Sequence, residues 1–213
     1  MKLVLSRESF LDRLGIVARG ASTRSAIQTL SGVLLTAEAG AAELQATDTE
    51  LGIRATVEAS VERDGSVVVP GRLLLDVARS LPADSVTIEY RASEQDVEVK
   101  SGSATFHLRT LPLEDFPKLP AASADATVSV PAAAFIETVD RVARAASRDE
   151  TRPHLTGVLV TATGNTLRMV ATDSYRLSVK ETPLEKQLSG DIEHDDDLAQ
   201  TVDKLKRQLA APA

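Results

Sequence analysis

The side chains that could carry out chemistry are few and scattered in this chain. There is no cysteine, which excludes disulfides, thiol catalysis and zinc–thiolate sites. The three histidines, His107, His154 and His194, are too far apart in the sequence to indicate a metal site. No glycine-rich phosphate loop, Ser–His–Asp pattern or carboxylate pair stands out. The sequence therefore predicts a non-catalytic protein that needs no cofactor and no metal.

One acidic cluster has two possible explanations. His194 is followed by three aspartates at 195–197, whose carboxylates could bind a hard cation. Acidic residues in the first turn of a helix explain the same pattern, because the positive end of the helix dipole attracts negative charge. We favour the helix explanation, since a helical pattern follows directly.

Two Thr-Asp pairs occur in the same local context. Thr47-Asp48 and Thr172-Asp173 lie 125 positions apart. A catalytic aspartate rarely needs a duplicate, whereas aspartate commonly accepts hydrogen bonds from backbone N–H groups in turns. We expect both aspartates to cap a turn or a strand end.

These pairs belong to a longer internal repeat. Residues 6–48 recur at 131–173 without a gap, and fifteen of the forty-three positions are identical. Solenoid repeats have periods of roughly 20–50 residues, so the longer period here indicates a duplicated domain. The chain is predicted to present similar surfaces side by side.

The composition is that of a soluble globular protein. Of the 213 residues, 43% are hydrophobic and 26% charged, but only 3% are aromatic, so Leu, Val, Ile and Ala must form the core. The apolar run at the N-terminus is too short for a secretory signal, and no stretch approaches the ~18 apolar residues of a membrane span. We expect a cytoplasmic protein.

Arginine is concentrated in the segments that are predicted to be helical. Segments 6–24, 70–82 and 131–148 have net charges of +2, +1 and +1, in a chain whose net charge is −7. From charge alone we interpret these segments as ordinary helix faces exposed to solvent, because a protein with a net negative charge is not typical of those that bind nucleic acids.

Hydrophobic periodicity predicts a first domain of two similar halves, each a strand, a helix and three strands. The first helix begins after Ser6, and the second is opened by Pro70. Their apolar stripes are Phe10, Leu14, Val17 and Ala21 in the first, and Leu73, Leu74, Val77 and Leu81 in the second. The expected strands are 2–5, 32–37, 43–47, 51–61, 67–69, 86–90, 97–100 and 105–108.

The second domain starts in the same way after a linker at 111–127. A short segment at 128–130 leads into a helix at 131–147, with the stripe Phe135, Val139, Val142 and Ala146, and strands follow near 156–162, 166–171 and 175–180. After Pro183 the pattern of the first domain is lost. An acidic run at 191–197 leads into a predicted helix with the stripe Leu198, Val202, Leu205 and Leu209.

Three stretches together resemble the bacterial sliding clamp family, the beta subunit of DNA polymerase III. They are Leu155–Leu159 (LTGVL), Ala171–Leu177 (ATDSYRL) and Arg109–Pro117 (RTLPLEDFP). The resemblance covers residues 1 to about 184. It implies an α+β DNA-clamp fold in which pairs of helices back antiparallel sheets. The implied parts are a full N-terminal domain (1–120), about the first half of a central domain (121–184), and an unmatched acidic tail with an amphipathic helix (185–213).

The resemblance also implies a function. In that family two chains pair into a ring that slides on duplex DNA and tethers the replicative polymerase, so the implied protein is a processivity factor. Its implied partners are duplex DNA, the polymerase, the clamp loader and a second copy of the chain, with no membrane. Arginines on the inner helices would contact phosphates without reading bases.

The site residues implied by the resemblance form two sets. The DNA-contacting set is Arg24, Arg72, Arg79, Arg141, Arg144, Arg148 and Arg152. The second set is one wall of the pocket in which the family binds partner peptides, namely Leu155, Thr172, Ser174, Tyr175, Arg176 and Leu177.

The sequence departs from a full clamp, which has three domains. The opposite wall of the pocket and the third domain, with which the first normally pairs, have no counterpart in this sequence. The alternative is a clamp-derived fragment or interaction module that forms no ring. In that case the 198–209 helix would cover surface left bare by the missing half-domain, or bind a partner.

Overall fold

The computed structural model describes residues 1–22, 25–119 and 129–184. The chain divides into two compact units, Met1–Ala121 and Ala122–Ala213, which we describe separately. Arg24, residues 120–127 of the predicted linker, and the tail with its acidic run and predicted helix lie outside the described residues.

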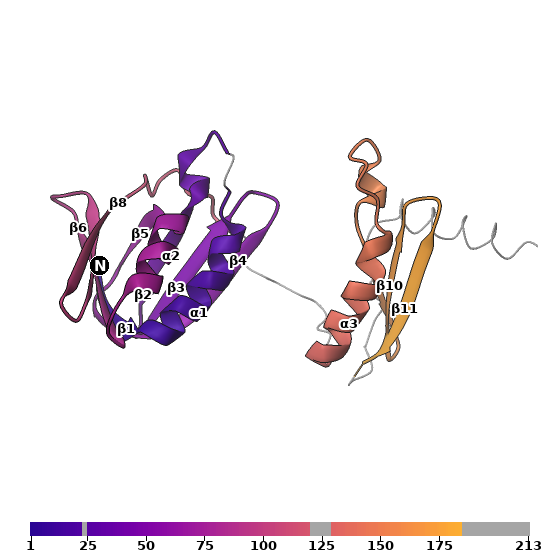
Figure 1. Cartoon of the computed structure of the whole chain (residues 1–213), viewed down its shortest axis with the longest axis horizontal. Coiled ribbons are helices and arrows are strands. Elements are labelled where there is room, and N and C mark those ends of the chain that lie inside the picture. Colours follow the sequence, from indigo (N-terminus) through magenta and orange to yellow (C-terminus); the bar gives the residue numbers. More distant parts are fainter. Residues whose placement is uncertain (23–24, 120–128, 185–213) are drawn as a thin grey trace, which may run out of the picture. The chain divides into compact units, whose positions relative to one another are not determined.

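The first unit is one antiparallel sheet with two helices on the same face (Figure 1). The strand order is β5-β2-β3-β4-β1-β6-β7-β8. The helices are α1 (Arg7–Val17) and α2 (Gly71–Ser80). The strands are β1 (Lys2–Ser6), β2 (Gly32–Glu38), β3 (Ala41–Thr47), β4 (Gly52–Arg63), β5 (Gly65–Pro70), β6 (Ser85–Arg91), β7 (Asp96–Ser101) and β8 (Ala104–Arg109).

This unit is built from the two similar halves that the sequence predicted. Each half runs strand, helix, three strands: β1-α1-β2-β3-β4 and β5-α2-β6-β7-β8. The first strand of each half pairs with the first of the three later strands of the other half, β1 with β6 and β5 with β2, so the two halves exchange their first strands. The shared pairing explains why both helices lie on one face.

The core of the first unit lies between the helices and the sheet. On α1, Phe10, Leu14 and Val17 are fully buried. On α2, Leu74 is fully buried, but Leu73 is 48% exposed. The prediction that Leu73 belongs to the buried stripe was therefore wrong, because Leu74, Val77 and Ala78 already form the face that meets the sheet and α1.

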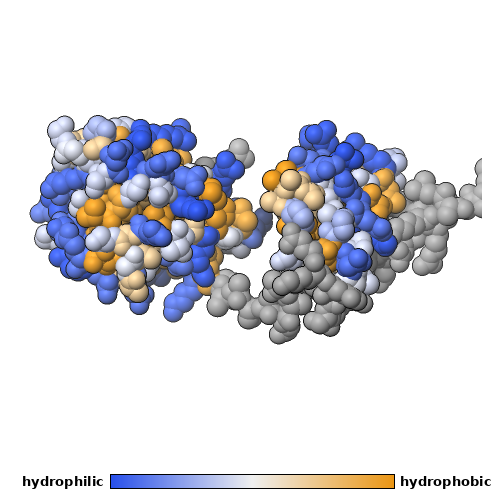
Figure 2. All heavy atoms as spheres, turned by 90° about the horizontal axis from the view of Figure 1, so that it is seen from below, coloured by the Kyte–Doolittle hydropathy of each residue, from blue (hydrophilic) through white to orange (hydrophobic). Residues whose placement is uncertain are grey.

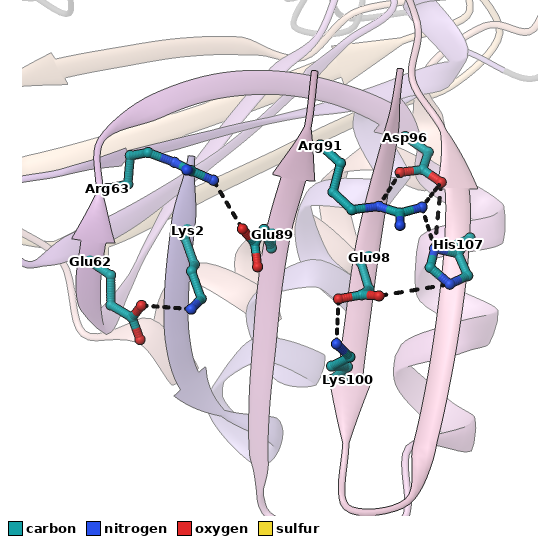
Figure 3. A network of polar contacts seen from close by, with 9 residues as sticks. All are labelled: Lys2, Glu62, Arg63, Glu89, Arg91, Asp96, Glu98, Lys100 and His107. Atoms are coloured by element: carbon teal, nitrogen blue, oxygen red, sulfur yellow. Dashed lines mark hydrogen bonds and ion pairs between the residues drawn. The ribbon is translucent and has the colours of Figure 1, made fainter. Parts of the chain in front are cut away.

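The opposite face of this sheet carries charged pairs, which Figure 3 shows from β4 to β8. Lys2 pairs with Glu62 at 2.8 Å, and Arg91 binds Asp96 through two nitrogens at 2.6 and 2.8 Å. The hydrogen bond from Arg91 lowers the pKa of Asp96 below its usual value. Strand alternation thus directs apolar side chains to the helices and charges to solvent.

The second unit repeats this pattern in its helix and strands. Its described α-helix is α3 (Ala132–Val142), and its described strands are β9 (Leu159–Thr163), β10 (Thr166–Thr172) and β11 (Leu177–Pro183), in the order β11-β10-β9. Two short 3-10 helices, η3 (Ala143–Ala145) and η4 (Pro153–Leu155), lie between α3 and β9. Subtracting 125 from the bounds of α3 and β10 gives those of α1 and β3. The repeat extends to the pairing register, since Thr166↔Pro183 corresponds to Ala41↔Glu58. The predicted duplication is therefore confirmed at the level of individual residue pairs.

Burial differs between the two copies. Phe10 is fully buried, but its counterpart Phe135 is 43% exposed, so the prediction that both helices bury the same stripe was wrong at this position. In the first unit α2 and four further strands complete the domain, whereas the described part of the second unit holds no second α-helix. The apolar pattern of a helix predicts which side packs against other elements, but it does not show how completely those elements bury that side.

A buried polar contact joins α3 to β11. The hydroxyls of Thr138 and Thr182 lie 2.6 Å apart, and both residues are buried. Thr138 Oγ1 also donates to the Ala134 carbonyl at 2.7 Å. Because buried hydroxyls require partners, this contact fixes how the helix sits on the strand.

Candidate functional site

The two Thr-Asp pairs form matching turns. Asp48 Oδ1 accepts the backbone N–H groups of Glu50 at 3.1 Å and Leu51 at 2.7 Å. Asp173 Oδ1 accepts those of Tyr175 and Arg176, both at 3.0 Å. The prediction of turn caps is confirmed. The backbone N–H groups stabilise the ionised carboxylate and so lower the pKa of Asp173 below its usual value; the N–H of Tyr175 has the largest effect and that of Arg176 the next largest.

Each turn contains one residue with a left-handed backbone. Thr49 has φ of 85° and its counterpart Ser174 has φ of 80°, a conformation that residues other than glycine rarely adopt. The threonine of each pair supports it, since Thr47 Oγ1 accepts the Thr49 N–H and Thr172 Oγ1 accepts the Ser174 N–H. In the second unit the turn leaves Tyr175 94% exposed.

The apolar residues of the predicted pocket, Leu155 and Leu177, pack in one small cluster. Leu155 is buried in a small cluster with Leu159 and Val170, against which Leu177 packs. The Leu155 carbonyl accepts the Ser147 N–H at 2.8 Å, and the first unit has the corresponding bond from Ser22 to Leu30 at 2.7 Å. The loop before Leu155 is thus another part of the duplication.

Between the loop that precedes Leu155 and the Asp173 turn, the surface of the second unit is hollowed. The depression has a volume of about 550 Å³, and its lining includes Arg144, Arg148, Arg152, Tyr175 and Arg176. The structure therefore brings arginines from the predicted DNA-contacting set next to residues from the predicted peptide pocket. Sequence reasoning treated the two sets separately, because nothing in their spacing shows that the two loops meet.

The charges around the depression are partly neutralised. Arg152 pairs with Asp149 at 3.0 Å and donates to Ser174 Oγ at 3.3 Å. Arg176 pairs with Asp173 at 3.0 Å. Arg144 and Arg148 are exposed, and neither forms an ion pair with any of the described residues. These two arginines are the uncompensated positive charges of the site.

The remaining predicted arginines lie on helices. Arg72 and Arg79 are exposed on α2, and Arg79 lies 3.5 Å from Asp76. On α3, Arg141 pairs with Glu137 at 2.8 Å. Arg24 falls outside the described residues.

One arginine was left out of the predicted set. Arg19 is the repeat counterpart of Arg144, is exposed, and forms no ion pair within the described part of the chain. The repeat itself is the signal that could have identified it, because identical residues at matching positions are expected to serve similar surfaces.

Comparison with known proteins decides the family. Residues 1–120 match the model of the DNA polymerase III beta subunit, N-terminal domain, and residues 129–194 match that of its central domain. This chain belongs to the DNA polymerase III beta subunit family. The family accounts for both the DNA-clamp fold and the duplication.

Several relatives of the family are similar to this chain. The beta sliding clamp of Micrococcus luteus is 42% identical over 192 residues, which are 89% of this chain and 61% of the relative. That of Streptomyces coelicolor is 39% identical over 181 residues, which are 85% of this chain and 47% of the relative. This chain therefore spans about half to three fifths of the length of these relatives.

Solved structures of the family give the same picture. The DNA polymerase sliding clamp of Bacillus subtilis matches with a TM-score of 0.83 and 25% identity, covering 90% of this chain and 52% of the clamp. That of Caulobacter crescentus matches with a TM-score of 0.82 and 28% identity, covering the whole chain and 58% of the clamp.

Two further features were sought in the described residues. No group of three or more histidine, aspartate or glutamate side chains is arranged there to hold a metal ion. No helix of that part of the chain has the length and apolar character required to cross a membrane.

Proposed function

We propose that this chain acts as a sliding-clamp polypeptide, which tethers the replicative DNA polymerase to duplex DNA through contacts that do not depend on base sequence. It is an accessory subunit without catalytic activity of its own. The proposal rests on membership of the DNA polymerase III beta subunit family and on one structural observation. That observation is the pair of uncompensated arginines, Arg144 and Arg148, beside the depression.

Arginines of this kind suit weak contacts with phosphate groups. Each neutralised phosphate releases condensed counterions, which adds affinity but no sequence preference. Arg19, Arg72, Arg144 and Arg148 are exposed and without ion pairs among the described residues, so they can meet phosphates without first breaking an ion pair. Arg79 and Arg141 have carboxylate neighbours and would contribute less.

The second part of the proposal concerns partner proteins. Tyr175, exposed at the rim of the depression, and the buried Leu155 cluster would form one wall of a site for a peptide from the polymerase or the clamp loader. Exposed aromatic side chains are common anchors in protein interfaces.

Salt dependence of DNA binding tests the proposal. Fluorescence anisotropy with labelled duplexes of unrelated sequence is expected to show similar affinities, which fall as salt rises. For Arg144→Ala/Arg148→Ala the slope of log K against log salt should decrease by roughly 1.8, because each lost phosphate contact contributes about 0.9. Arg168→Ala is the matched control, since Arg168 is held by Glu181 at 2.6 Å on the sheet. Absence of binding at low salt would refute the DNA-tethering function.

A second candidate is a clamp-derived fragment or interaction module that binds partners without encircling DNA. The observation in its favour is that the described part of the second unit has one α-helix and three strands, against two and eight in the first. Retention of the protein on circular DNA distinguishes the sliding clamp from the interaction module. A closed ring stays on a nicked circle and is lost when the circle is cut, whereas a module is retained equally on both or on neither.

A further inference from the structure

Residues 111–119, at the start of the predicted linker, lie against the first unit. We call this segment the strap. At one end Leu111 forms an antiparallel bridge with Val68 on β5, and its N–H donates to the Val68 carbonyl at 2.8 Å. At the other end the Arg54 side chain on β4 donates to the Leu119 carbonyl at 3.5 Å. The strap therefore crosses from β5 to β4, which are separated in the sheet by β2 and β3.

Two leucines of the strap lie over glycines that begin strands. A Cβ added to Gly32, the first residue of β2, would lie 3.0 Å from Leu111 Cδ1. A Cβ added to Gly52, the first residue of β4, would lie 2.9 Å from Leu119 Cδ2, and the three atoms nearest to it all belong to Leu119. The missing side chains at both glycines thus make room for the strap.

The internal repeat gives this place a counterpart in the second unit. Gly52 corresponds to Leu177, and the Asp48 turn directly before it corresponds to the Asp173 turn. Leu30, which is buried, corresponds to Leu155. The strap therefore lies on the first-unit copy of the elements that form the proposed peptide site of the second unit.

The described part of the second unit leaves the same place open. A Cβ added to Gly157, the counterpart of Gly32, would meet no atom of the described residues within 4 Å. Val179, the counterpart of Arg54, is 44% exposed. Apolar side chains reach the surface of both units in Figure 2, so exposure alone does not distinguish the two copies. The strap is the difference between them.

Side chains, more than the backbone, hold the strap. Among the described residues, positions 112–118 form no hydrogen bond with the rest of the unit. Phe116 is nevertheless only 8% exposed, and Leu111 and Leu119 are half-buried. The strap thus has the features of a short peptide ligand, with apolar anchors on a preformed surface.

We propose that the first unit carries a second peptide-binding site, which the strap occupies in cis. The ligand class follows from the occupant. It is an extended peptide whose leucine and phenylalanine side chains take the places of Leu111, Phe116 and Leu119. The proposal rests on the proposed function only for the likeness between this site and the one in the second unit.

A tethered occupant excludes free peptides. A short flexible connection gives an effective concentration of about 1 mM, so a free peptide competes poorly below that concentration. The apparent Kd of the wild-type first unit for such a peptide should therefore be about 1 mM or weaker. Release of the strap would uncover the site.

Fluorescence anisotropy on the full chain tests the proposal, with a labelled peptide of the sequence 109–119 as the probe. Phe116→Ser/Leu119→Asp removes the side chains that hold the strap. This released variant is expected to bind the probe at least about tenfold more tightly than the wild type. The matched control Leu113→Ser/Lys118→Asp changes two exposed residues of the same segment and should bind as the wild type does.

Unchanged hydrogen exchange in α1 verifies that the released variant is folded. Leu119→Asp alone changes only a half-buried residue and should give a smaller gain in the same direction, which covers the case in which the double variant does not fold.

Gly52→Leu shows where the probe binds. Leu177 at the matching position of the second unit indicates that this backbone accepts a leucine. In the released variant the new side chain would fill the place that Leu119 leaves, so the gain in binding should be lost.

Three results would each overturn the proposal. They are equal binding by the wild type and the released variants, no binding by any of them, and a gain that Gly52→Leu leaves unchanged. The last result would place the probe on the second unit. Because no DNA is present in this assay, its outcome is separate from that of the DNA-tethering test.

Discussion

The hydroxyl contact between Thr138 and Thr182 offers a quantitative test of how α3 is held on β11. Thr138→Val and Thr182→Val each replace a hydroxyl with a methyl of similar size. The structure predicts unequal costs for the two changes, because Thr138 has a second partner in the Ala134 carbonyl and no second partner of Thr182 Oγ1 is found among the described residues.

The magnitudes follow from which group is left without a partner. In Thr138→Val the buried Thr182 hydroxyl loses its partner, which costs about 1–3 kcal/mol. In Thr182→Val the Thr138 hydroxyl keeps its bond to Ala134, so only the net value of one hydrogen bond is lost, about 0.5–1.5 kcal/mol. The double variant leaves no unpaired hydroxyl at this contact, so its stability is expected to be close to that of the wild type.

Hydrogen exchange measured by mass spectrometry is the appropriate assay, because it reports on the second unit separately from the first. Peptides covering 132–142 and 177–183 should lose protection by a factor of about 5–150 in Thr138→Val. The loss should be smaller in Thr182→Val and largely restored in the double variant. A peptide from β7 serves as an internal control and should not change. Additive losses in the double variant would refute the reasoning, because they would show that the two hydroxyls act independently.

Three further outcomes are expected. Phe10→Ala should lower the free energy of unfolding of the first unit by about 3–5 kcal/mol in urea, because Phe10 is fully buried. The control Ile16→Ala should cost less than about 1 kcal/mol, because Ile16 is 42% exposed. Equal effects would contradict the packing of α1. The Tyr175 amide signal in NMR should titrate with a midpoint below the usual pKa of an aspartate, because its N–H stabilises ionised Asp173. The turn therefore gains stability from ionisation above the unfolded-state pKa and loses it as pH falls through the lowered pKa. A midpoint at or above the usual value would exclude the lowered pKa. Tyr175→Ala should change the free energy of unfolding by less than about 0.5 kcal/mol while weakening any peptide bound at the depression, because this side chain is 94% exposed; unchanged peptide binding would remove Tyr175 from the site.

The duplication made much of the fold predictable from the sequence. The gap-free repeat of 6–48 at 131–173 predicts the same elements in both copies, and it also predicts the same strand register, because a shift of one residue would turn the apolar face of a strand towards solvent. The caps at Asp48 and Asp173 were also predictable from the repeat. The same turn in both copies needs a side-chain oxygen that accepts backbone N–H groups, and aspartate supplies it at both positions.

Other features depend on contacts between distant segments and could not be predicted. Leu73 belongs to an apolar run, yet it faces solvent because its neighbours fill the helix–sheet contact. Phe135 has the pattern of a core residue, yet it is 43% exposed, because no described element covers it as fully as its counterpart Phe10 is covered. The contact between Arg152 and Ser174 is similar, because it joins two loops that are separate in the sequence.

The turn around Ser174 has a consequence for any ligand that enters the depression. Its backbone is held by Asp173 and Thr172 before a ligand arrives, so association need not order the loop. Immobilising a flexible side chain on binding costs about 0.5–1.5 kcal/mol, and here that entropic penalty would fall on the exposed side chains of Tyr175, Arg144 and Arg148. The depression combines a preorganised main chain with adaptable side chains, a combination that would suit several short peptides that differ in sequence.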